Sequence, residues 1–230
     1  MHLKPLASSL AIWLSLIGPF AASADENKDW AQLEKYAAAN AALAPVSAGE
    51  KRVVFFGDSI TQGWSIDKSF PKKPYVNRGI SGQTTPQMLV RFRQDVLNLK
   101  PKVVVILAGT NDLAQNTGVE TNEQIEGYFK SLCELARENN VSVVLSSILP
   151  VIDYPWRTGM QPAPKIAELN KWLKDYAGKY KLVYLDYFSS MADSKNGMKK
   201  ELSEDGVHPN AAGYAIMAPL ADKAIDQAVK

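Results

Sequence analysis

Short continuous apolar runs alternate along this chain with stretches of helical periodicity. The runs occupy residues 53–56, 103–107, 141–145 and 182–185, and residues 74–77 form a shorter candidate. Continuous apolar runs of this length are typical of parallel strands that are covered on both faces. The pattern therefore predicts a mainly parallel β-sheet.

The stretches between the runs carry apolar residues at helical spacing and have readable ends. Their predicted starts hold a capping residue or an early proline, as at Thr85-Pro86, at Thr121 with Gln124, and at Asn210. Strands that alternate with helices in this way predict a three-layer α/β domain with helices on both faces of the sheet.

The first 24 residues have the pattern of a secretory signal peptide. Lys4 is their single cation, residues 6–20 form an apolar run, and Ala22 and Ala24 are small residues at the positions that a signal peptidase reads. A membrane anchor is the alternative, but the run is shorter than the roughly 20 residues that span a bilayer. We therefore expect cleavage after Ala24 and a secreted or periplasmic protein with no stable membrane span.

Residues 25–50 are rich in alanine and charge and differ from the strand–helix pattern that follows. Their apolar positions share one helical stripe, made of Trp30, Leu33, Ala37 and Ala41. We expect an N-terminal helical extension here. One domain over residues 51–230 then accounts for the rest of the chain, because no linker or internal repeat interrupts it.

Composition narrows the chemistry of this domain. The 26 Lys and Arg against 24 Asp and Glu leave a net charge of +2, which lacks the basic excess of a nucleic-acid binder. Of two histidines, cleavage removes His2, so the mature chain keeps only His208. A multi-histidine metal centre is therefore not expected, and no cofactor is predicted.

Polar or small residues follow several of the predicted strands. Ser59 follows the first run, Gly79 the short candidate strand and Asn111 the run at residues 103–107. Ligands of an open parallel sheet bind outside the carboxyl ends of its strands, so these loops should converge. We expect Ser59 to be a nucleophile, with the N–H groups of Ser59 and Gly79 and the Asn111 side-chain amide as donors to an oxyanion.

His208 is the predicted base for this serine, because it is the only imidazole of the mature chain. Asp205, three residues upstream, is expected to hold the imidazole in one tautomer and to stabilise its charged form. Asp186, at the end of the last strand, is the competing carboxylate. Taken alone, Ser59 and His208 are also compatible with capping roles, but together with an aspartate they indicate a serine hydrolase.

Four separated motif blocks resemble those of the SGNH, or GDSL-type, hydrolase superfamily. Residues 56–61 match its serine block, residues 77–82 its glycine block, residues 109–112 its asparagine block, and residues 205–209 the block with the acid and the base. The resemblance implies a flavodoxin-like α/β/α sandwich with a five-stranded, mainly parallel sheet. It also implies a carboxylester hydrolase without a metal. Ser59, Gly79, Asn111, Asp205 and His208 would then have the catalytic and oxyanion-binding roles described above.

Within this superfamily, residues 57–64 and 77–85 are most similar to the branch of platelet-activating-factor acetylhydrolase catalytic subunits and carbohydrate O-acetylesterases. This likeness suggests a short acyl group, acetyl first, removed from a small-molecule or carbohydrate ester. Hydrolysis of a lysophospholipid or an acyl-thioester is the alternative within the superfamily. A non-catalytic sugar-binding module is the alternative from another class.

Aromatic residues near the predicted site are candidates for the substrate pocket. Tyr154 and Trp156 lie in a loop at residues 149–164 that follows a predicted strand, and Trp64 follows the serine block. Loops of this kind carry binding residues in many enzymes, although such rings also pack a loop onto its domain.

Overall fold

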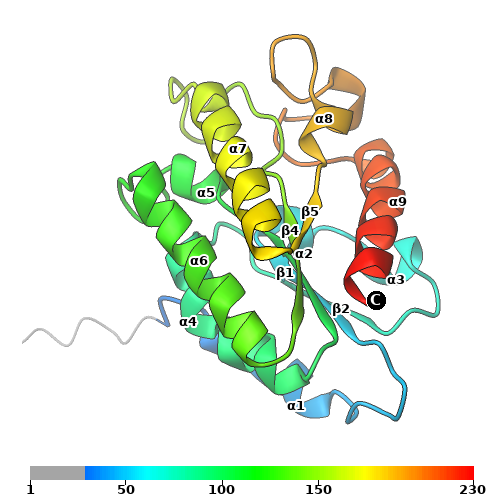
Figure 1. Cartoon of the computed structure of the whole chain (residues 1–230). Coiled ribbons are helices and arrows are strands. Elements are labelled where there is room, and N and C mark those ends of the chain that lie inside the picture. The colour runs from blue at the N-terminus through cyan, green and yellow to red at the C-terminus, as the bar shows by residue number, and fades with distance from the viewer. Residues whose placement is uncertain (1–28) are drawn as a thin grey trace, which may run out of the picture.

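The computed structural model describes residues 29–230, so the expected signal peptide at residues 1–24 lies outside the described residues. Its sheet has five parallel strands in the order β2-β1-β3-β4-β5 (Figure 1). In chain order these are β1 (Val53–Gly57), β2 (Tyr75–Gly79), β3 (Val103–Leu107), β4 (Ser142–Ser146) and β5 (Val183–Leu185). The predicted parallel sheet is confirmed, and the short candidate strand is the edge strand β2.

Helices cover both faces of the sheet (Figure 1). One face packs against α4 (Thr85–Asp95), α6 (Asn122–Glu138) and α7 (Ala163–Tyr180), and the other against α2 (Ser59–Gln62), α3 (Ile66–Ser69) and α9 (Ala211–Ala228). Shorter helices are α1 (Ala37–Ala42), α5 (Thr110–Leu113), α8 (Phe188–Met191) and the 3-10 turns η1 (Leu33–Tyr36), η2 (Leu97–Leu99) and η3 (Lys200–Leu202). Across residues 29–230, no helix combines the length and the apolar character needed to cross a bilayer.

Strand β1 shows why its apolar run is continuous. Val54 and Phe56 pack into the core on the side of α4, α6 and α7, whereas Val53 and Phe55 pack into the core on the side of α9. Successive side chains of a strand point to opposite faces, so a strand covered on both faces needs apolar residues at every position.

The helix starts follow the sequence signals closely. Thr121 caps α6 and forms the expected capping box with Gln124, and the Asn210 side chain accepts hydrogen bonds from the first N–H groups of α9. The start of α4 differs by one residue, because Thr84 is its N-cap and the Gln87 side chain accepts from the Thr84 N–H. Pro86 then lies within the first turn, where its missing N–H costs nothing.

The N-terminal helix is much shorter than the expectation for residues 25–50. Within residues 29–50, only η1 and α1 form, and neither contains a buried residue. Trp30, placed on the expected apolar stripe, is 51% exposed. The prediction of an apolar stripe that faces the domain is therefore wrong for Trp30, Ala37 and Ala41, which are all exposed.

A buried guanidinium lies where β1 and β2 end. Arg91, on α4, is fully buried and donates to the carbonyls of Gly57 and Arg78, at 2.9 Å each. It also pairs with Asp95 at 3.1 Å and lies 4.2 Å from the centre of the Phe56 ring. Because a buried charge needs its partners, these contacts hold the ends of both strands against α4.

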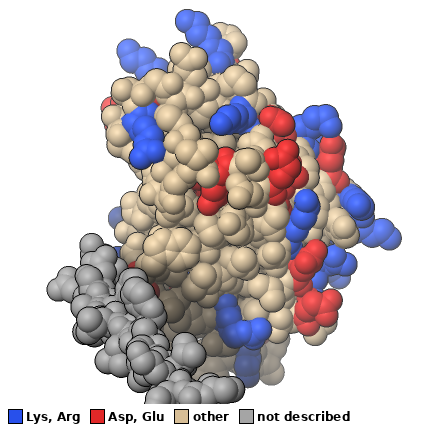
Figure 2. Space-filling model, turned by 90° about the vertical axis from the view of Figure 1, so that its left-hand side faces the viewer, with Lys and Arg blue, Asp and Glu red and all other residues tan. Residues whose placement is uncertain are grey.

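Charged side chains of both signs lie next to one another on the side of the molecule that Figure 2 shows. A chain with a net charge of +2 has nearly equal numbers of acidic and basic residues. Interspersed charges of this kind make an ordinary solvated surface.

Gly79, the last residue of β2, lies against the backbone of α2. A Cβ atom at this position would lie 2.2 Å from the Gln62 nitrogen and 2.7 Å from the Asp58 carbonyl oxygen. Backbone atoms cannot move aside as the end of a side chain can. Glycine is therefore required here so that β2 can approach the helix that begins at Ser59.

We predict opposite effects for two glycine-to-alanine substitutions. Gly79→Ala lowers the free energy of unfolding by about 1–3 kcal/mol, because the new methyl group overlaps backbone atoms. Gly127→Ala, inside α6 with nothing within 4 Å of the added Cβ, raises it by about 0.5–1 kcal/mol. Urea unfolding of both variants measures the difference, and a neutral or stabilising Gly79→Ala would contradict the close approach.

Candidate active site

Ser59 lies at a sharp turn from β1 into α2. Asp58 is the N-cap of this helix, and its carboxylate accepts a hydrogen bond from the Ile60 N–H at 3.0 Å. Burial raises the pKa of Asp58 to about 6. The cap fixes the first turn of α2 and directs its first side chain, Ser59, away from the end of the strand.

The structure brings Ser59, His208 and Asp205 together. The Ser59 Oγ lies 2.8 Å from His208 Nε2, and His208 Nδ1 lies 2.6 Å from Asp205 Oδ2. An ionised carboxylate only accepts hydrogen bonds, so the Nδ1 atom carries the proton and Nε2 is free to accept from the serine hydroxyl. This arrangement can take the proton from Ser59 as the hydroxyl attacks a substrate.

Asp205 is held by its own loop. Its Oδ1 accepts from the N–H groups of Val207 and His208 and from the Ser203 hydroxyl. Burial acts to raise the pKa of Asp205, but the hydrogen bonds from His208 and Val207 outweigh it and lower this pKa to about 2. The carboxylate is therefore ionised at any pH at which a neutral histidine can act as a base.

Asp186, the competing carboxylate, has a different role. Its two oxygens accept from the N–H and the hydroxyl of Ser189, at 2.9 and 2.7 Å, in the turn that begins α8. Asp205, and not Asp186, is the carboxylate that touches His208.

Asn111 is oriented by two polar contacts on the far side of the site. It lies in α5, directly after β3, and is buried. Its Oδ1 accepts from the Asn116 side chain, and its Nδ2 donates to the Gln83 carbonyl, at 3.0 Å each. One N–H of this amide therefore remains available to a substrate. Asn116, which sequence reasoning missed, also donates to the Gly82 carbonyl and so ties Asn111 to the loop after β2.

Gly79 does not present the donor that the sequence suggested. Its N–H donates to the Asn77 side chain at 2.9 Å. Gly82, three residues later, has a φ of 76° in a turn, and its N–H makes no hydrogen bond within residues 29–230. The N–H of Ser59 is likewise without an acceptor in this part of the chain. Gly82, together with Ser59 and Asn111, therefore offers the free donors.

Gly82 lies between the other two donors. The N–H of the neighbouring Ser81 donates to the Gln62 side chain of α2 at 2.7 Å. The carbonyl of Gly82 accepts from Asn116 at 3.1 Å. The sequence signal that could have favoured Gly82 over Gly79 is its position in a turn after the strand. N–H groups within a strand usually donate to the neighbouring strands, so they are not free to bind a substrate.

The three aromatic pocket candidates differ in exposure. The Trp156 ring is 44% exposed, and its centre lies 5.9 Å from that of the His208 ring. Tyr154 is fully buried, bonds Thr110 at 3.1 Å and packs against Trp156. Trp64 is 3% exposed and stacks on Tyr214. Only Trp156 can present a face to a bound molecule, so the expectation for Tyr154 and Trp64 is corrected: they are packing residues.

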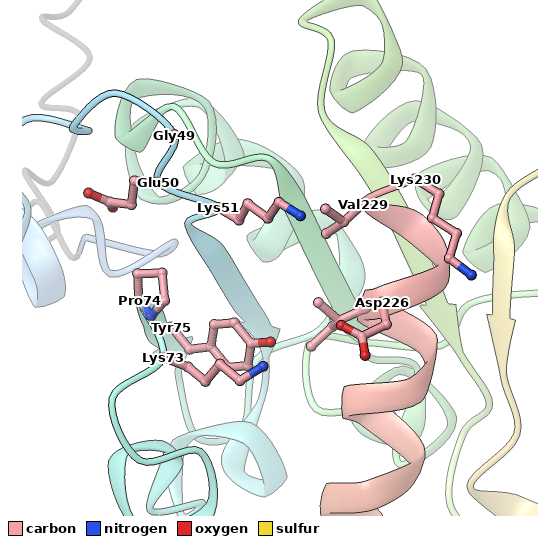
Figure 3. A pocket seen from close by; sticks show the side chains of 10 residues that line it. Gly49, Glu50, Lys51, Lys73, Pro74, Tyr75, Asp226, Val229 and Lys230 are labelled. Atoms are coloured by element: carbon pink, nitrogen blue, oxygen red, sulfur yellow. The ribbon is translucent and has the colours of Figure 1, made fainter.

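A cavity of about 640 Å³ lies at the other end of the sheet (Figure 3). Lys51, Lys73, Tyr75 and Asp226 are among the residues that line it, and Tyr75 is the first residue of β2. Ser59, in contrast, lies two residues after Gly57, the last residue of β1, and therefore at the opposite end of the parallel sheet. The lining of this cavity contains no serine or histidine, so it does not compete with the site at Ser59.

Comparisons with known proteins agree with this geometry. The model of the GDSL-like lipase/acylhydrolase family matches residues 55–216. The crystal structure of a GDSL-like lipase from Bacteroides thetaiotaomicron is 44% identical, with a TM-score of 0.83 over 86% of this chain and 98% of that one. The human platelet-activating factor acetylhydrolase IB subunit alpha2 is 31% identical over 183 residues, which are 74% of this chain and 75% of the relative.

Two bacterial relatives match over shorter stretches. An acetylxylan esterase from Geobacillus stearothermophilus is 27% identical over 62% of this chain and 68% of its own length. The lipoprotein YqeF of Bacillus subtilis is 32% identical over 46% of this chain, and the match spans about half, 51%, of that relative. Because the family model covers well over half of the chain, the chain belongs to the GDSL-like lipase/acylhydrolase family, the SGNH-type esterases and acylhydrolases.

Proposed function

We propose that this protein is a serine carboxylester hydrolase that uses Ser59, His208 and Asp205. The observation that carries the proposal is the continuous hydrogen-bonded chain from the Ser59 hydroxyl through His208 to Asp205. A serine hydroxyl is a weak nucleophile until an oriented base removes its proton, and this chain supplies both the base and the group that orients it.

The reaction follows from the positions of these groups. The Ser59 oxygen bonds to the ester carbonyl carbon while His208 Nε2 takes the hydroxyl proton. The carbonyl oxygen becomes an oxyanion, and the N–H groups of Ser59 and Gly82 and the amide of Asn111 donate to it. The alcohol leaves with the proton from His208. A water molecule then attacks the acyl-serine in the same way, releasing the acid and restoring Ser59 and His208.

The proposed substrate is a short acyl ester, acetyl first, of a carbohydrate. Trp156 supports this choice, because an exposed aromatic ring beside the histidine offers a flat apolar face to a sugar ring. Two of the relatives support the acetyl group, since they are named an acetylhydrolase and an acetylxylan esterase. Lysophospholipids and acyl-thioesters are the other substrates to compare.

We also propose that the protein works outside the cytoplasm, as a secreted or periplasmic enzyme cleaved after Ala24. The apolar run and small residues before Ala24 support this location. A relative that is named a lipoprotein supports it as well.

A fluorophosphonate probe tests the nucleophile. We expect the probe to label Ser59 and abolish ester hydrolysis, because the oxygen that the base activates also attacks phosphorus. Mass spectrometry locates the adduct, and Ser59→Ala is the control that remains unlabelled. Labelling at another residue, or full hydrolysis by Ser59→Ala, would exclude this mechanism. Absence of both labelling and ester hydrolysis in the wild-type protein would favour a sugar-binding module.

Two aspartate substitutions test the carboxylate. Asp205→Asn is expected to lower kcat at least about 100-fold, because an amide no longer holds His208 in the tautomer that accepts from serine. Asp186→Asn, a matched control away from His208, changes kcat less than about twofold. Steady-state kinetics with p-nitrophenyl acetate measures both, and similar losses in the two variants would show that contact with His208 is not the cause.

Two substitutions of Trp156 test the sugar platform. Trp156→Ala is expected to raise KM for acetylated xylo-oligosaccharides about 3- to 10-fold, since a ring that packs against a sugar contributes roughly this much binding. The KM for p-nitrophenyl acetate stays within twofold, and Trp156→Phe retains most of the affinity. Equal changes for both substrates would argue against the platform.

A further inference from the structure

Polar contacts hold residues 29–43 on the domain. Ala31 is the one buried apolar residue of this segment. Three glutamine side chains at or near α4 donate to consecutive or nearby carbonyls of the segment: Gln87 to Trp30 at 2.7 Å, Gln83 to Ala31 at 2.7 Å and Gln94 to Leu33 at 2.6 Å. The segment is therefore attached by its backbone, through partners that the domain supplies.

Gln83 connects this segment to the candidate active site. Its side chain is fully buried, its Oε1 accepts from the Arg91 guanidinium, and its Nε2 donates to the Ala31 carbonyl. Its backbone carbonyl accepts from the Asn111 amide at 3.0 Å. Gln83 also directly follows Gly82. One residue thus touches the N-terminal segment, the buried cation and two of the groups proposed to bind the oxyanion.

Gln87 holds the other end of the same loop. Its Oε1 accepts from the Thr84 N–H at 3.0 Å, while its Nε2 donates to the Trp30 carbonyl. Gln87 itself is buried, with 8% of its surface exposed. Loss of the Trp30 carbonyl leaves this amide donor without a partner, which favours a rearrangement of the Gln87 side chain and of the loop that it holds.

Further contacts attach the segment to the end of β2, where this loop begins. The Tyr36 hydroxyl donates to the Gly79 carbonyl at 2.5 Å, and Arg78 donates to the Asn40 side chain at 2.7 Å. The segment therefore bonds Gly79 just before the loop at residues 80–84 and Gln83 within it. At the end of the loop the contact is indirect, through Gln87.

We propose that residues 30–36 are a brace that positions the oxyanion loop, residues 80–84, and that Gln83 is the positioning residue through which the brace acts. The proposal rests on the proposed function, since it assumes that Gly82 and Asn111 bind the oxyanion. Displacement of such donors by a fraction of an ångström weakens binding of the transition state more than binding of the ester.

Gln83→Met tests the brace, with the full mature chain and p-nitrophenyl acetate as substrate. We expect kcat to fall about 10- to 100-fold while KM stays within twofold. The Ki of phenylboronic acid, whose tetrahedral adduct on Ser59 places an oxygen at the oxyanion position, rises by the same factor. Gln94→Met is the matched control, because it removes the same kind of bond to the same segment away from the loop, and it changes kcat and Ki less than about twofold.

Gln83→Glu decides the matter if Gln83→Met does not fold. Glutamate keeps the shape of the side chain and an oxygen for Arg91 but loses the donor to Ala31, so it should show the same loss of kcat and boronate affinity. Wild-type kcat and Ki in a folded Gln83 variant, or a loss of kcat with unchanged Ki, would overturn the brace. Wild-type kcat in Asn111→Ala would instead overturn the proposed oxyanion site itself.

Discussion

The buried ion pair of Arg91 and Asp95 is the interaction on which the arrangement of the site depends. Burial lowers the pKa of Arg91 to about 10, which still leaves it charged at neutral pH. Breaking a buried pair by removing one partner typically costs 3–5 kcal/mol. Because Arg91 also bonds the carbonyls of Gly57 and Arg78, its guanidinium is the shared partner of the strand end that precedes Ser59 and the strand end that precedes Gly82.

The groups proposed for catalysis come from two parts of the fold, the ends of the central strands and a separate loop near the C-terminus. Ser59 and Asn111 lie in the first turns of the short helices that follow β1 and β3, the neighbouring strands at which the chain reverses its direction across the sheet. The side chains of His208 and Asp205 are 37% and 38% exposed and belong to a loop that Ser203 and the local backbone organise. The oxyanion groups thus receive their positions from the core, and the base receives its position from its own loop.

The N-terminal segment is also held in place by buried polar groups. Its helices bury no residue, yet its carbonyls satisfy amides that the domain has buried beside Arg91. A buried donor without a partner is costly, so the segment and the domain complete each other through hydrogen bonds rather than through apolar area. These hydrogen bonds explain how an alanine-rich segment with a weak apolar stripe is held at one position on the domain.

The sequence by itself determined the layers and most of the chemistry. The apolar runs marked β1, β3, β4 and β5, because strands covered on both faces favour apolar side chains throughout, and a shorter candidate marked the edge strand β2. Capping residues marked the starts of α6 and α9. The scarcity of histidine and the four motif blocks identified Ser59, Asn111, Asp205 and His208 as candidates. Each of these inferences depends on residue type and on local order, which a sequence displays directly.

Only the tertiary structure decided which equivalent groups are free to act. Gly79 and Gly82 are alike in sequence, but the N–H of Gly79 is taken by Asn77 and that of Gly82 is not. Trp156 is exposed beside His208 while Trp64 is buried. The N-terminal segment is bonded to Gln83, Gln87 and Gln94, which lie more than 50 residues away along the chain. Burial and hydrogen-bond partners are properties of contacts between distant segments, and local patterns do not encode them.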